Sequence, residues 1–338
     1  MEKFDIIIVG AGPAGLKAAE ILAKNKKKVL VLEKNKIIGP KVCAAGITEK
    51  DIEHIPKELI EREFQTAIFK NHKKKIRIKL KEKLYTIERK TLGQYQAKEA
   101  KKAGAIIKTN SFVKKIKNNS VTTNNKEYSF DYLIGADGST STVRTHLKLK
   151  TKLTALAVQY KIKKVVGDIE LHFNTKKFNA WYAWIFPHKN YTYIGTGTLL
   201  TPKQKENIRT TLDNFAKQQN LTTKDQEFEA AMINVDYKGH IFNNIFLIGD
   251  AAALANPFTG EGIYQAIISG EAIANKILNP HNENKKLNKI IKKNIKLIKI
   301  ILFLNKHPII LNLTYNLGFK LMKFKPFQNK LLKILLDY

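Results

Sequence analysis

The chain has 338 residues, of which 43% are hydrophobic and 26% are charged. This composition is typical of a globular protein of about two domains, and it excludes a disordered or collagen-like chain. The single cysteine, Cys43, excludes an intramolecular disulfide framework and a multi-cysteine zinc site. Lys and Arg total 60 against 29 Asp and Glu, which gives a formal net charge of +31. This excess reflects either a lysine-rich surface vocabulary or a partner of opposite sign, such as anionic lipid, an acidic redox protein or nucleic acid.

The N-terminal apolar run Phe4–Val9 is too short for the core of a signal peptide, and no stretch reaches the ~18 uninterrupted apolar residues of a membrane span. The nearest candidate, Ile300–Leu313, is interrupted by Asn305-Lys306-His307-Pro308. We therefore expect a cytoplasmic protein, with a peripheral position on the inner membrane face as an open alternative.

The first motif begins with Asp5–Val9, in which four β-branched residues follow the aspartate, a pattern typical of a strand buried on both faces of a parallel sheet. The glycine-rich segment Gly10–Gly15 follows, then a helical stretch to about Lys24, and then a second strand, Lys28–Leu32, which ends in Glu33. This order of strand, glycine turn, helix, strand and acid predicts a dinucleotide-binding unit.

Each residue type in this motif has a physical role. Gly10 permits the tight turn, Gly12 lets a pyrophosphate approach the backbone, and Gly15 lets the helix pack on the strand. Amides around Ala14 at the helix N-terminus favour the negative charge of the pyrophosphate. Glu33 is placed to accept hydrogen bonds from ribose hydroxyls. A glycine-rich turn without a ligand is the alternative, and the strands and acid in register argue against it.

Two later segments favour FAD over NAD. One strand ends in Asp137-Gly138, and another ends in Gly249-Asp250 before the loop Asn256–Gly262 and a helix from about Ile263 to Leu278. A carboxylate at the end of a strand, such as Asp250, can hold the ribitol chain. The glycine-lined helix start offers amide donors and a positive dipole end to the N1/O2 edge of a reduced isoalloxazine ring.

Together these motifs resemble the p-hydroxybenzoate hydroxylase-like FAD superfamily. Within it the chain is most similar to the geranylgeranyl reductase family, which includes the archaeal digeranylgeranylglycerophospholipid reductases. Three segments carry this resemblance: the loop Lys41–Gly46, the aromatic segment Tyr182–Pro187 and the loop Asn256–Gly262. The chain departs from the family pattern at Asn179, where the family has proline, and after Arg89, where Arg-Lys-Thr-Leu-Gly replaces Arg-x-x-Phe-Asp.

The motifs and the resemblance together imply a set of FAD-binding residues, in which Val113 contributes backbone near the adenine. In chain order the set is Gly10, Gly12, Ala14, Gly15, Glu33, Cys43, Ala44, Gly46, Arg89, Val113, Asp137, Asp250, Gly260, Gly262 and Ile263.

The rest of the chain predicts an α/β fold with a Rossmann-like FAD-binding lobe, an antiparallel-sheet substrate lobe and a basic helical C-terminus. We expect the FAD-binding domain in residues 1–62, 87–150 and 236–280, the substrate domain in 63–86 and 151–235, and a basic amphipathic helical region in 281–338. Within the substrate domain the patterns predict a hairpin of Phe64–Lys70 and Lys74–Leu80, strands at Ala155–Tyr160, Ile169–Phe173, Ala180–Phe186 and Tyr191–Thr198, and a helix from Lys203 to Gln219 capped by Thr201-Pro202.

The densest aromatic cluster follows Ala180. A period of two places Tyr182, Trp184 and Phe186 on one face of a strand and Trp181 with Ile185 on the other. Residue type alone favours sheet core. The resemblance instead implies an isoprenoid-binding face made by Tyr182, Trp184, Phe186 and Pro187.

Cys43 is either a small buried hydrophobic residue or a group near the flavin that shapes the pocket or relays a proton. Cys43 and Tyr182 are the candidate catalytic residues, with bound water as a further proton source. The histidines, including His172, His188 and His240, show no metal-ligand spacing, and we expect them at the surface or at sheet edges.

Residues 281–338 carry 13 lysines against Glu283 and Asp337. Apolar residues from Leu287 to Leu302 recur at helical spacing, so the segment predicts a basic amphipathic helix. Its apolar face either docks on the FAD lobe or lies in an anionic bilayer surface.

The resemblance implies an FAD-dependent reductase that saturates double bonds of geranylgeranyl chains on archaeal-type membrane lipids. The electron donor is then NAD(P)H or an acidic reduced ferredoxin, which the net charge favours. The alternative enzyme is an FAD-dependent monooxygenase that uses NAD(P)H and oxygen. The halogenase pattern Trp-x-Trp-x-Ile-Pro is broken here, and a basic nucleic-acid-binding protein would leave the dinucleotide motifs unexplained.

Overall fold

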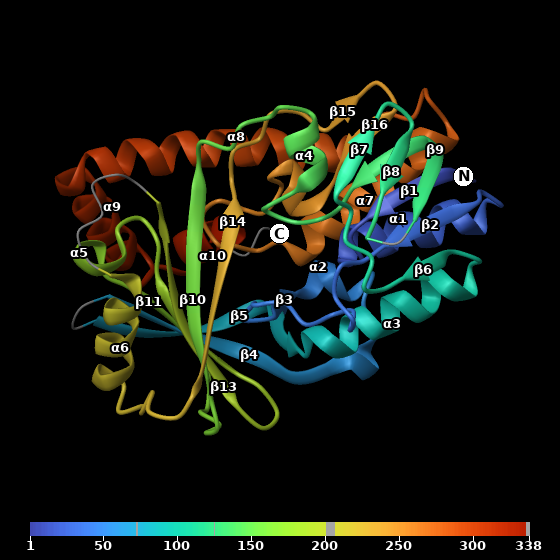
Figure 1. Cartoon of the computed structure of the whole chain (residues 1–338). Helices are drawn as coiled ribbons and strands as arrows, with labels where there is room; N and C mark the ends of the chain where they lie inside the picture. Colours follow the sequence, from blue (N-terminus) through green and yellow to red (C-terminus); the bar gives the residue numbers. More distant parts are fainter. Residues whose placement is uncertain (72–73, 125, 201–206, 336–338) are drawn as a thin grey trace. The chain divides into compact units, whose positions relative to one another are not determined.

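The computed structural model describes residues 1–71, 74–124, 126–200 and 207–335 and divides into two units (Figure 1). Unit 1 consists of Met1–Lys41, Arg89–Thr154 and Ile233–Ile295. Unit 2 consists of Val42–Glu88, Ala155–Met232 and the chain from Lys296 onward.

Unit 1 contains a twisted sheet with the strand order β15-β16-β9-β1-β2-β6, to which a β7–β8 hairpin is added at β9. The central pairs β1–β9, β1–β2, β2–β6 and β9–β16 are parallel. The strands are β1 (Glu2–Val9), β2 (Val29–Leu32), β6 (Ile106–Lys108), β7 (Lys115–Lys117), β8 (Ser120–Thr122), β9 (Glu127–Gly135), β15 (Ile241–Phe242) and β16 (Ile245–Leu247).

The parallel strands are apolar because helices cover them. Ile6 and Ile8 of β1 pack into one core cluster and Ile7 and Val9 into another, so this strand is buried on both faces, as predicted. The helices of this unit are α1 (Pro13–Lys24), α3 (Arg89–Lys102), α4 (Thr142–His146), the short 3-10 helix η2 (Gly249–Ala252), α7 (Ile263–Leu278) and the first half of α8 (Lys285–Lys306).

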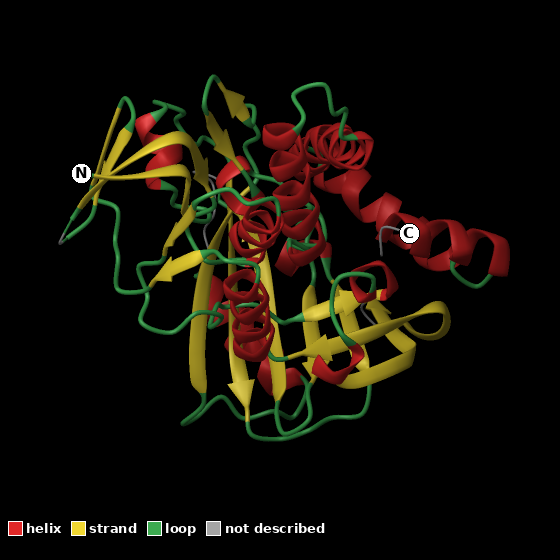
Figure 2. Ribbon diagram, turned by 90° about the vertical axis from the view of Figure 1, so that its right-hand side faces the viewer, coloured by secondary structure: helices red, strands yellow, loops and turns green. Residues whose placement is uncertain are grey.

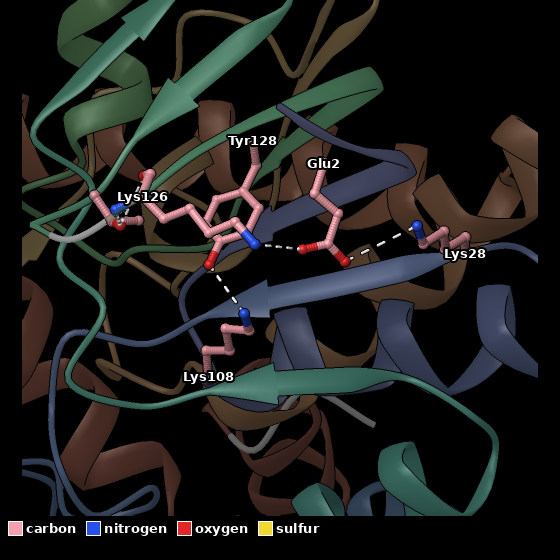
Figure 3. A network of polar contacts seen from close by, with 6 residues as sticks. Glu2, Lys28, Lys108, Lys126 and Tyr128 are labelled. Atoms are coloured by element: carbon pink, nitrogen blue, oxygen red, sulfur yellow. Dashed lines mark hydrogen bonds and ion pairs between the residues drawn. The ribbon is translucent and has the colours of Figure 1, made fainter.

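A polar network ties the beginning of β1 to its neighbours (Figure 3). The Glu2 carboxylate lies 2.9 Å from the ammonium group of Lys126 and 4.0 Å from that of Lys28. The hydrogen bond from Lys126 lowers the pKa of Glu2. Lys108 donates to the Tyr128 hydroxyl at 3.0 Å, and Tyr128 lies opposite Glu2 in the β1–β9 register. These contacts are at the exposed margin of the sheet, where screening by solvent keeps their contribution to stability small.

Unit 2 contains a largely antiparallel sheet with the strand order β14-β10-β13-β12-β11-β4-β5-β3. Its strands are β3 (Gly46–Thr48), β4 (Ile60–Asn71), β5 (Lys74–Ile87), β10 (Thr154–Ile162), β11 (Ile169–Phe173), β12 (Ala183–Pro187), β13 (Thr192–Leu199) and β14 (Glu227–Asn234). One face of this sheet packs against α6 through a core cluster that includes Val158, Ile194, Leu212 and Phe215.

The helices of unit 2 are α2 (Glu49–Ile52), the 3-10 helix η1 (Lys57–Leu59), α5 (Thr175–Phe178), α6 (Ile208–Gln218), the second half of α8, α9 (Pro308–Leu321) and α10 (Lys325–Leu335). Figure 2 shows that the C-terminal segment is helical apart from short turns. Within the described residues no single helix is long and apolar enough to cross a membrane. Helices α8 and α9 meet that criterion only as a pair, and they are bent by 114° at the break between them.

Most predicted elements occur with small shifts of their ends, including the helix that begins at Ile263. The predicted hairpin also occurs, but β4 begins at Ile60 and β5 continues to Ile87, so both strands are longer than predicted. The predicted strand from Ala180 begins only at Ala183. Asn179 has a left-handed φ of 51°, and the Trp181 amide donates to the Phe178 carbonyl, so the chain is still turning after α5. Helix α6 begins at Ile208 with an Asn207 cap, and the predicted cap at Thr201-Pro202 lies outside the described residues.

The two units differ in their bounds from the domains expected from the sequence. The sequence places residues 42–62 in the FAD lobe, whereas in the structure they belong to unit 2, because β3 and β4 pair with β5 in its sheet. Residues 281–338 were expected as one region. The structure divides them within α8, with the chain up to Ile295 in unit 1 and the chain from Lys296 in unit 2.

Candidate functional site

The glycine turn after β1 is a cradle made of backbone. Gly10 has a φ of +104°, and a Cβ atom there would lie 2.4 Å from the Ala136 carbonyl oxygen. A Cβ at Gly15 would lie 2.2 Å from the Gly10 carbonyl oxygen. At Gly12, by contrast, no heavy atom of the described residues lies within 4 Å of the Cβ position. Gly10 and Gly15 therefore permit close backbone packing, and Gly12 leaves open space on the ligand side of the turn.

The N-terminus of α1 can receive an anion. Its N-cap is Gly12, and no side chain among the described residues caps it, so the amides around Ala14 are available to a ligand. Glu33, at the end of β2, is 8% exposed and accepts hydrogen bonds from the amides of Ala11 at 2.8 Å and Asn35 at 2.9 Å. A carboxylate has about four acceptor positions, so it can still accept from ribose hydroxyls.

The segment before β7 lies beside Glu33. The Ser111 amide donates to the Glu33 carbonyl oxygen at 2.8 Å, and Val113 is 2% exposed in the core of unit 1. This is the position that the resemblance implied for backbone near the adenine.

Arg89 begins α3, as predicted, and its Nε atom is buried without a hydrogen-bond partner among the described residues. The helix start packs against the chain at Gly39, where a Cβ would lie 3.0 Å from the Arg89 carbonyl oxygen and 2.7 Å from that of Lys90. A buried guanidinium nitrogen without a partner is costly, so the site fits an acceptor supplied by a ligand such as a phosphate.

Asp250 lies in η2, directly after β16, with its side chain 13% exposed. One carboxylate oxygen lies 2.7 Å from the ammonium group of Lys41. The other lies 3.5 Å from the position that a Cβ would take at Gly262, which is the N-cap of α7. No side chain of the described residues caps α7, so Ile263 and the following amides stand beside Asp250 as donors.

Asn256 organises the loop between η2 and α7, a role that the sequence motif did not reveal. Its side-chain oxygen accepts from the amides of Phe258 at 2.9 Å and Thr259 at 3.2 Å. Its carbonyl oxygen accepts from the Gly260 amide at 2.9 Å, and Gly260 has a φ of +72°. The loop that precedes α7 is therefore shaped by one residue that is 1% exposed.

Asp137 lies before α4, where its carboxylate accepts from the amides of Thr142 at 2.6 Å and Val143 at 3.3 Å. Burial raises the pKa of this carboxyl group. Arg144, which is 2% exposed, donates to the carbonyl oxygens of Asp236 at 2.6 Å and Ala251 at 3.3 Å. Asp137 thus stabilises the start of α4, and Arg144 connects α4 to η2.

These residues fit a flavin dinucleotide. The open backbone at Gly12, the uncapped start of α1 and the unpaired Arg89 Nε suit a pyrophosphate. Glu33 and Asp250 suit the ribose and ribitol hydroxyls, and the uncapped start of α7 suits the electron-rich edge of a reduced ring.

In unit 2, three aromatic rings pack directly against three glycines. A Cβ at Gly195 would lie 2.3 Å from the Trp184 indole, and a Cβ at Gly46 would lie 2.3 Å from the Phe186 ring. A Cβ at Gly197 would lie 2.3 Å from the Trp181 indole. We call the resulting surface, on the side of the sheet opposite α6, the aromatic face.

The prediction that Trp181 lies on the opposite face from Trp184 is wrong. Gly195 and Gly197 are two residues apart in β13, so their Cβ positions point to the same side of the sheet. Trp181 precedes β12, is not bound by its alternation, and folds over Gly197 on the same side as Trp184. The two indoles therefore pack on neighbouring positions of the same face of β13.

Tyr182 packs among these rings, with its centroid 6.1 Å from that of Trp184 and 5.6 Å from that of Phe173. Pro187 ends β12, and its carbonyl oxygen accepts a hydrogen bond from the Thr86 hydroxyl at 3.1 Å. Tyr182, Trp184 and Phe186 thus lie together, and Pro187 holds the end of their strand.

The Cys43–Gly46 loop is held by a buried histidine. His188 is 0% exposed, and its ring nitrogens lie within hydrogen-bonding distance of the Glu61 carboxylate and of the Ala44 carbonyl oxygen. The Cys43 sulfur accepts from the Ala45 amide at 3.3 Å. The expectation of surface or edge positions is wrong for His188 and also for His172, which is 8% exposed. Periodicity could not reveal this, because the partners of His188 are remote in sequence.

The sequence analysis also missed a carboxylate on the aromatic face. Gln159 of β10 lies opposite Gly195 in the β10–β13 register and is 1% exposed. Its amide donates to the Glu229 carboxylate of β14 at 2.6 Å. Burial raises the pKa of Glu229. The negative charge of Glu229 in turn contributes to the raised pKa of the half-buried Tyr193, after burial. Phe228 packs toward α6, so Glu229 points to the other side, toward the aromatic face.

A family model described as an FAD binding domain matches residues 76–287, more than half of the chain. The chain belongs to this family of flavoproteins. A second model, described as pyridine nucleotide-disulphide oxidoreductase, matches residues 4–144, which include the dinucleotide cradle of the flavoprotein.

Curated relatives align with most of the length of the flavoprotein. It is 32% identical over 301 residues to an uncharacterized protein of Methanosarcina barkeri, with 81% of this chain and 74% of the relative covered. It is 29% identical over 309 residues to a digeranylgeranylglycerophospholipid reductase of Methanocaldococcus jannaschii, with 81% and 78% covered. A digeranylgeranylglycerophospholipid reductase 3 of Methanosphaera stadtmanae is 27% identical, with 80% and 76% covered. The predicted resemblance to the geranylgeranyl reductase family is confirmed.

Solved structures share the fold. A geranylgeranyl bacteriochlorophyll reductase-like protein of Thermoplasma acidophilum gives a TM-score of 0.74 at 24% identity, covering 100% of this chain and 92% of that chain. A flavin-dependent brominase gives a TM-score of 0.71 at 15% identity, covering 98% and 93%. The predicted fold, with its FAD-binding lobe, sheet lobe and helical C-terminus, and the prediction of an FAD-dependent oxidoreductase are confirmed.

Proposed function

We propose that the chain is an FAD-dependent reductase that saturates carbon–carbon double bonds of geranylgeranyl chains on archaeal-type membrane lipids. The observation that carries the proposal is the aromatic face, whose rings pack directly against Gly46, Gly195 and Gly197. Trp181 and Trp184 are 3% and 8% exposed, so they form the buried base of this face. Tyr182 and Phe186 are half-buried and are the rings that a ligand can reach. Large apolar rings suit an isoprenoid chain, which offers methyl groups and double bonds but few hydrogen-bonding groups. The names of the relatives from methanogens support the same substrate class.

When bound, reduced FAD would supply a hydride from N5 to one alkene carbon, and the addition of one proton to the other carbon would complete the saturated product. An isolated alkene is a poor electrophile, so a positioned acid must accompany hydride transfer. Glu33, Arg89 and Asp250 orient the cofactor in this proposal. The half-buried Tyr182 and Phe186 contact the isoprenoid chain, and the buried tryptophans behind them support these rings.

Glu229 is the acid that best fits this requirement. Its raised pKa favours the protonated form, and Gln159 fixes its position beside the aromatic face. Cys43 and Tyr182, the catalytic candidates from the sequence, are retained as groups that shape the face or relay a proton. Glu229 delivers the proton to the alkene, and solvent returns it between turnovers.

We further propose an acidic reduced ferredoxin as the electron donor, with NAD(P)H as the alternative. The net charge of +31 would attract an acidic protein at long range, and this attraction would weaken as salt is added. The lipid substrate also implies that the protein meets an anionic membrane surface on the cytoplasmic side.

The direct test reduces the bound flavin anaerobically and then adds a dispersed geranylgeranylated lipid. Recovery of the oxidised-flavin absorbance together with a saturated lipid product is expected. Reduced flavin that ignores the lipid but reacts with oxygen to hydroxylate another substrate would overturn the proposal in favour of a monooxygenase.

The role of Glu229 has its own control. We expect Glu229→Gln to slow lipid-dependent reoxidation by roughly 100-fold, the typical contribution of a general acid, while flavin binding stays unchanged. Glu227→Gln alters an exposed carboxylate on the same strand and should have little effect. Equal rates in the two variants would exclude Glu229 as the proton donor.

A further inference from the structure

Helix α9 has apolar side chains on two opposite faces. Its inner face docks on unit 2: Leu311 is 1% exposed, Phe319 is 3% exposed, and the Tyr315 hydroxyl donates to the Ala180 carbonyl oxygen at 2.9 Å. Its outer face carries Ile309 at 77% exposure, with Leu313 and Leu317 exposed at 63% and 57%. One face is thus explained by packing within unit 2, and the other is not.

The outer residues form a continuous stripe. Ile309, Leu313 and Leu317 are spaced four residues apart, so they lie one above the other along the helix. Ile310, which is 42% exposed, widens the stripe. Phe303 in the last part of α8 and Phe324 just after α9 flank these residues in the sequence and are themselves 51% and 64% exposed. We call this set the α9 stripe.

The first half of α8 behaves differently. Leu287, Ile290 and Ile291 are 2%, 9% and 8% exposed in the core of unit 1. Asn294 donates to the carbonyl oxygens of Leu254 at 2.8 Å and Ala255 at 3.2 Å. The first part of the amphipathic face predicted from the sequence is therefore docked, whereas Ile295 further along the helix is 38% exposed. The largest apolar surface that needs a partner lies beyond α8.

Charge indicates the kind of partner. Residues 284–336 contain 13 lysines and no acidic residue. Lys306 precedes α9, Lys320 lies in its last turn, and Lys323 and Lys325 follow it; all four are exposed. A stripe of apolar side chains with exposed lysines at both ends matches a surface that is apolar inside and anionic at its rim.

We propose that the α9 stripe inserts into the headgroup and upper acyl region of an anionic lipid bilayer and anchors the protein there without crossing it. The isoleucines and leucines of the stripe enter the apolar layer. The lysines stay at the level of the phosphates, where each adds electrostatic attraction. Phe303 and Phe324 lie at the boundary between the two regions.

Two other occupants fit the stripe less well. A second copy of this chain packed face to face would bring the lysines of two identical surfaces together without acidic partners, which would repel them. A nucleic acid would match the lysines but would leave the isoleucines and leucines facing phosphates. A lipid surface satisfies both kinds of side chain.

The inference names the partner surface of the proposed lipid reductase, and it rests on the proposed function only for the expectation that lipid is the substrate. Binding to vesicles can be measured without turnover, and turnover can be measured on detergent-dispersed lipid without vesicles. Failure of one therefore leaves the other intact.

The test is co-sedimentation of the full-length protein with vesicles of phosphatidylglycerol and phosphatidylcholine, compared with pure phosphatidylcholine. We expect binding to the anionic vesicles, weakened by salt. The double variant Leu313→Gln/Leu317→Gln should weaken binding about tenfold or more at every salt concentration, because its loss is apolar. The triple variant Lys320→Gln/Lys323→Gln/Lys325→Gln should instead reduce the preference for anionic vesicles.

A matched control is available on unit 2. Val165 and Met232 are both 44% exposed outside the C-terminal helices, so Val165→Gln/Met232→Gln removes similar apolar surface elsewhere. This control should bind vesicles like the wild type, and its unfolding midpoint should match that of the leucine variant, because all four side chains face solvent.

Three results would overturn the proposal. These are wild-type protein that ignores anionic vesicles, a leucine variant that binds as well as the control, and a concentration-dependent dimer that the leucine variant abolishes. The last result would assign the α9 stripe to a second copy of the chain.

Discussion

The cradle of unit 1 and the aromatic face of unit 2 both depend on glycines, but the glycines meet different neighbours. At Gly10 and Gly15 the missing Cβ would collide with carbonyl oxygens at 2.4 and 2.2 Å. At Gly195 and Gly197 the nearest atoms belong to indole rings at 2.3 Å, and at Gly195 the Val158 carbonyl oxygen follows at 2.7 Å. Backbone cannot move without unfolding the turn, whereas a ring can change its rotamer.

This difference suits the two tasks. A dinucleotide presents the same phosphates and ribose to every member of a family, so a rigid backbone cradle suits it. A hydrocarbon chain offers little but shape, so side chains set its path, and exchanging a ring can change the path without loss of the fold. The next three changes test this contrast in order of expected effect.

The largest effect is expected for Gly10→Ala. The new Cβ collides with the backbone at Ala136, and Gly10 also has a φ of +104°. We expect a loss of stability of about 3 kcal/mol or more, together with loss of bound flavin. Urea unfolding and the flavin absorbance of the purified protein measure both.

Gly104→Ala is the matched control for Gly10→Ala. Gly104 also has a φ of +104°, but no heavy atom of the described residues lies within 4 Å of its Cβ position. This variant should lose only about 1–2 kcal/mol, the cost of the backbone conformation. Equal losses would mean that conformation, not the collision with Ala136, makes Gly10 necessary.

A smaller effect is expected for Gly195→Ala. The methyl group displaces the Trp184 indole, so we expect a loss of about 1–3 kcal/mol in stability, slower turnover of lipid and unchanged flavin binding. Adding Trp184→Leu should restore only part of the stability, because the smaller side chain removes the collision with the ring but not the 2.7 Å approach to the Val158 carbonyl oxygen. Gly167→Ala, at an open position in unit 2, should be nearly neutral. If the stability loss of the double variant equals the sum of the losses of the two single variants, Gly195 and Trp184 are not energetically coupled.

The smallest effect concerns the opposite face of the same sheet, behind the aromatic face. Burial alone would raise the pKa of Glu170, but hydrogen bonds from His172 and Lys70 outweigh it and lower the pKa to about 2. A lowered carboxyl pKa contributes stability above its unfolded value of 4.5, and this contribution is lost as the pH falls toward 2. We expect Glu170→Gln to cost about 1–2 kcal/mol at neutral pH and almost nothing near pH 2.

Denaturant unfolding at several pH values from neutral to acid checks this sign. Glu63 of β4 forms an exposed ion pair with Lys83 of β5. Glu63→Gln should therefore change stability little at any pH. A Glu170→Gln cost that stays constant across the acid range would contradict the ionic origin of the effect. It would indicate instead that the Glu170 side chain stabilises the sheet through packing, which does not depend on pH.

The glycine turn and its flanking strands occur where the sequence predicts them, because Gly10, Gly12 and Gly15 lie within one strand-helix-strand unit. What the sequence could not show is the remote neighbour of Gly10, which is the Ala136 carbonyl oxygen. The sequence missed Glu229, since a carboxylate on a strand becomes notable only when Gln159 of a neighbouring strand lies beside it. It misplaced His188 for the same reason, because Glu61 and Ala44 are far away in the chain.

The sequence by itself therefore determined the elements, the glycine turns and the amphipathic pattern of the C-terminal helices, because these follow from backbone sterics and from periodicity. Only the tertiary structure decided what covers each apolar face. It placed Trp181 beside Trp184, buried Leu287 and Ile290 in unit 1, and left the α9 stripe exposed. Periodicity shows that a helix has an apolar face, but burial depends on which segment packs against that face.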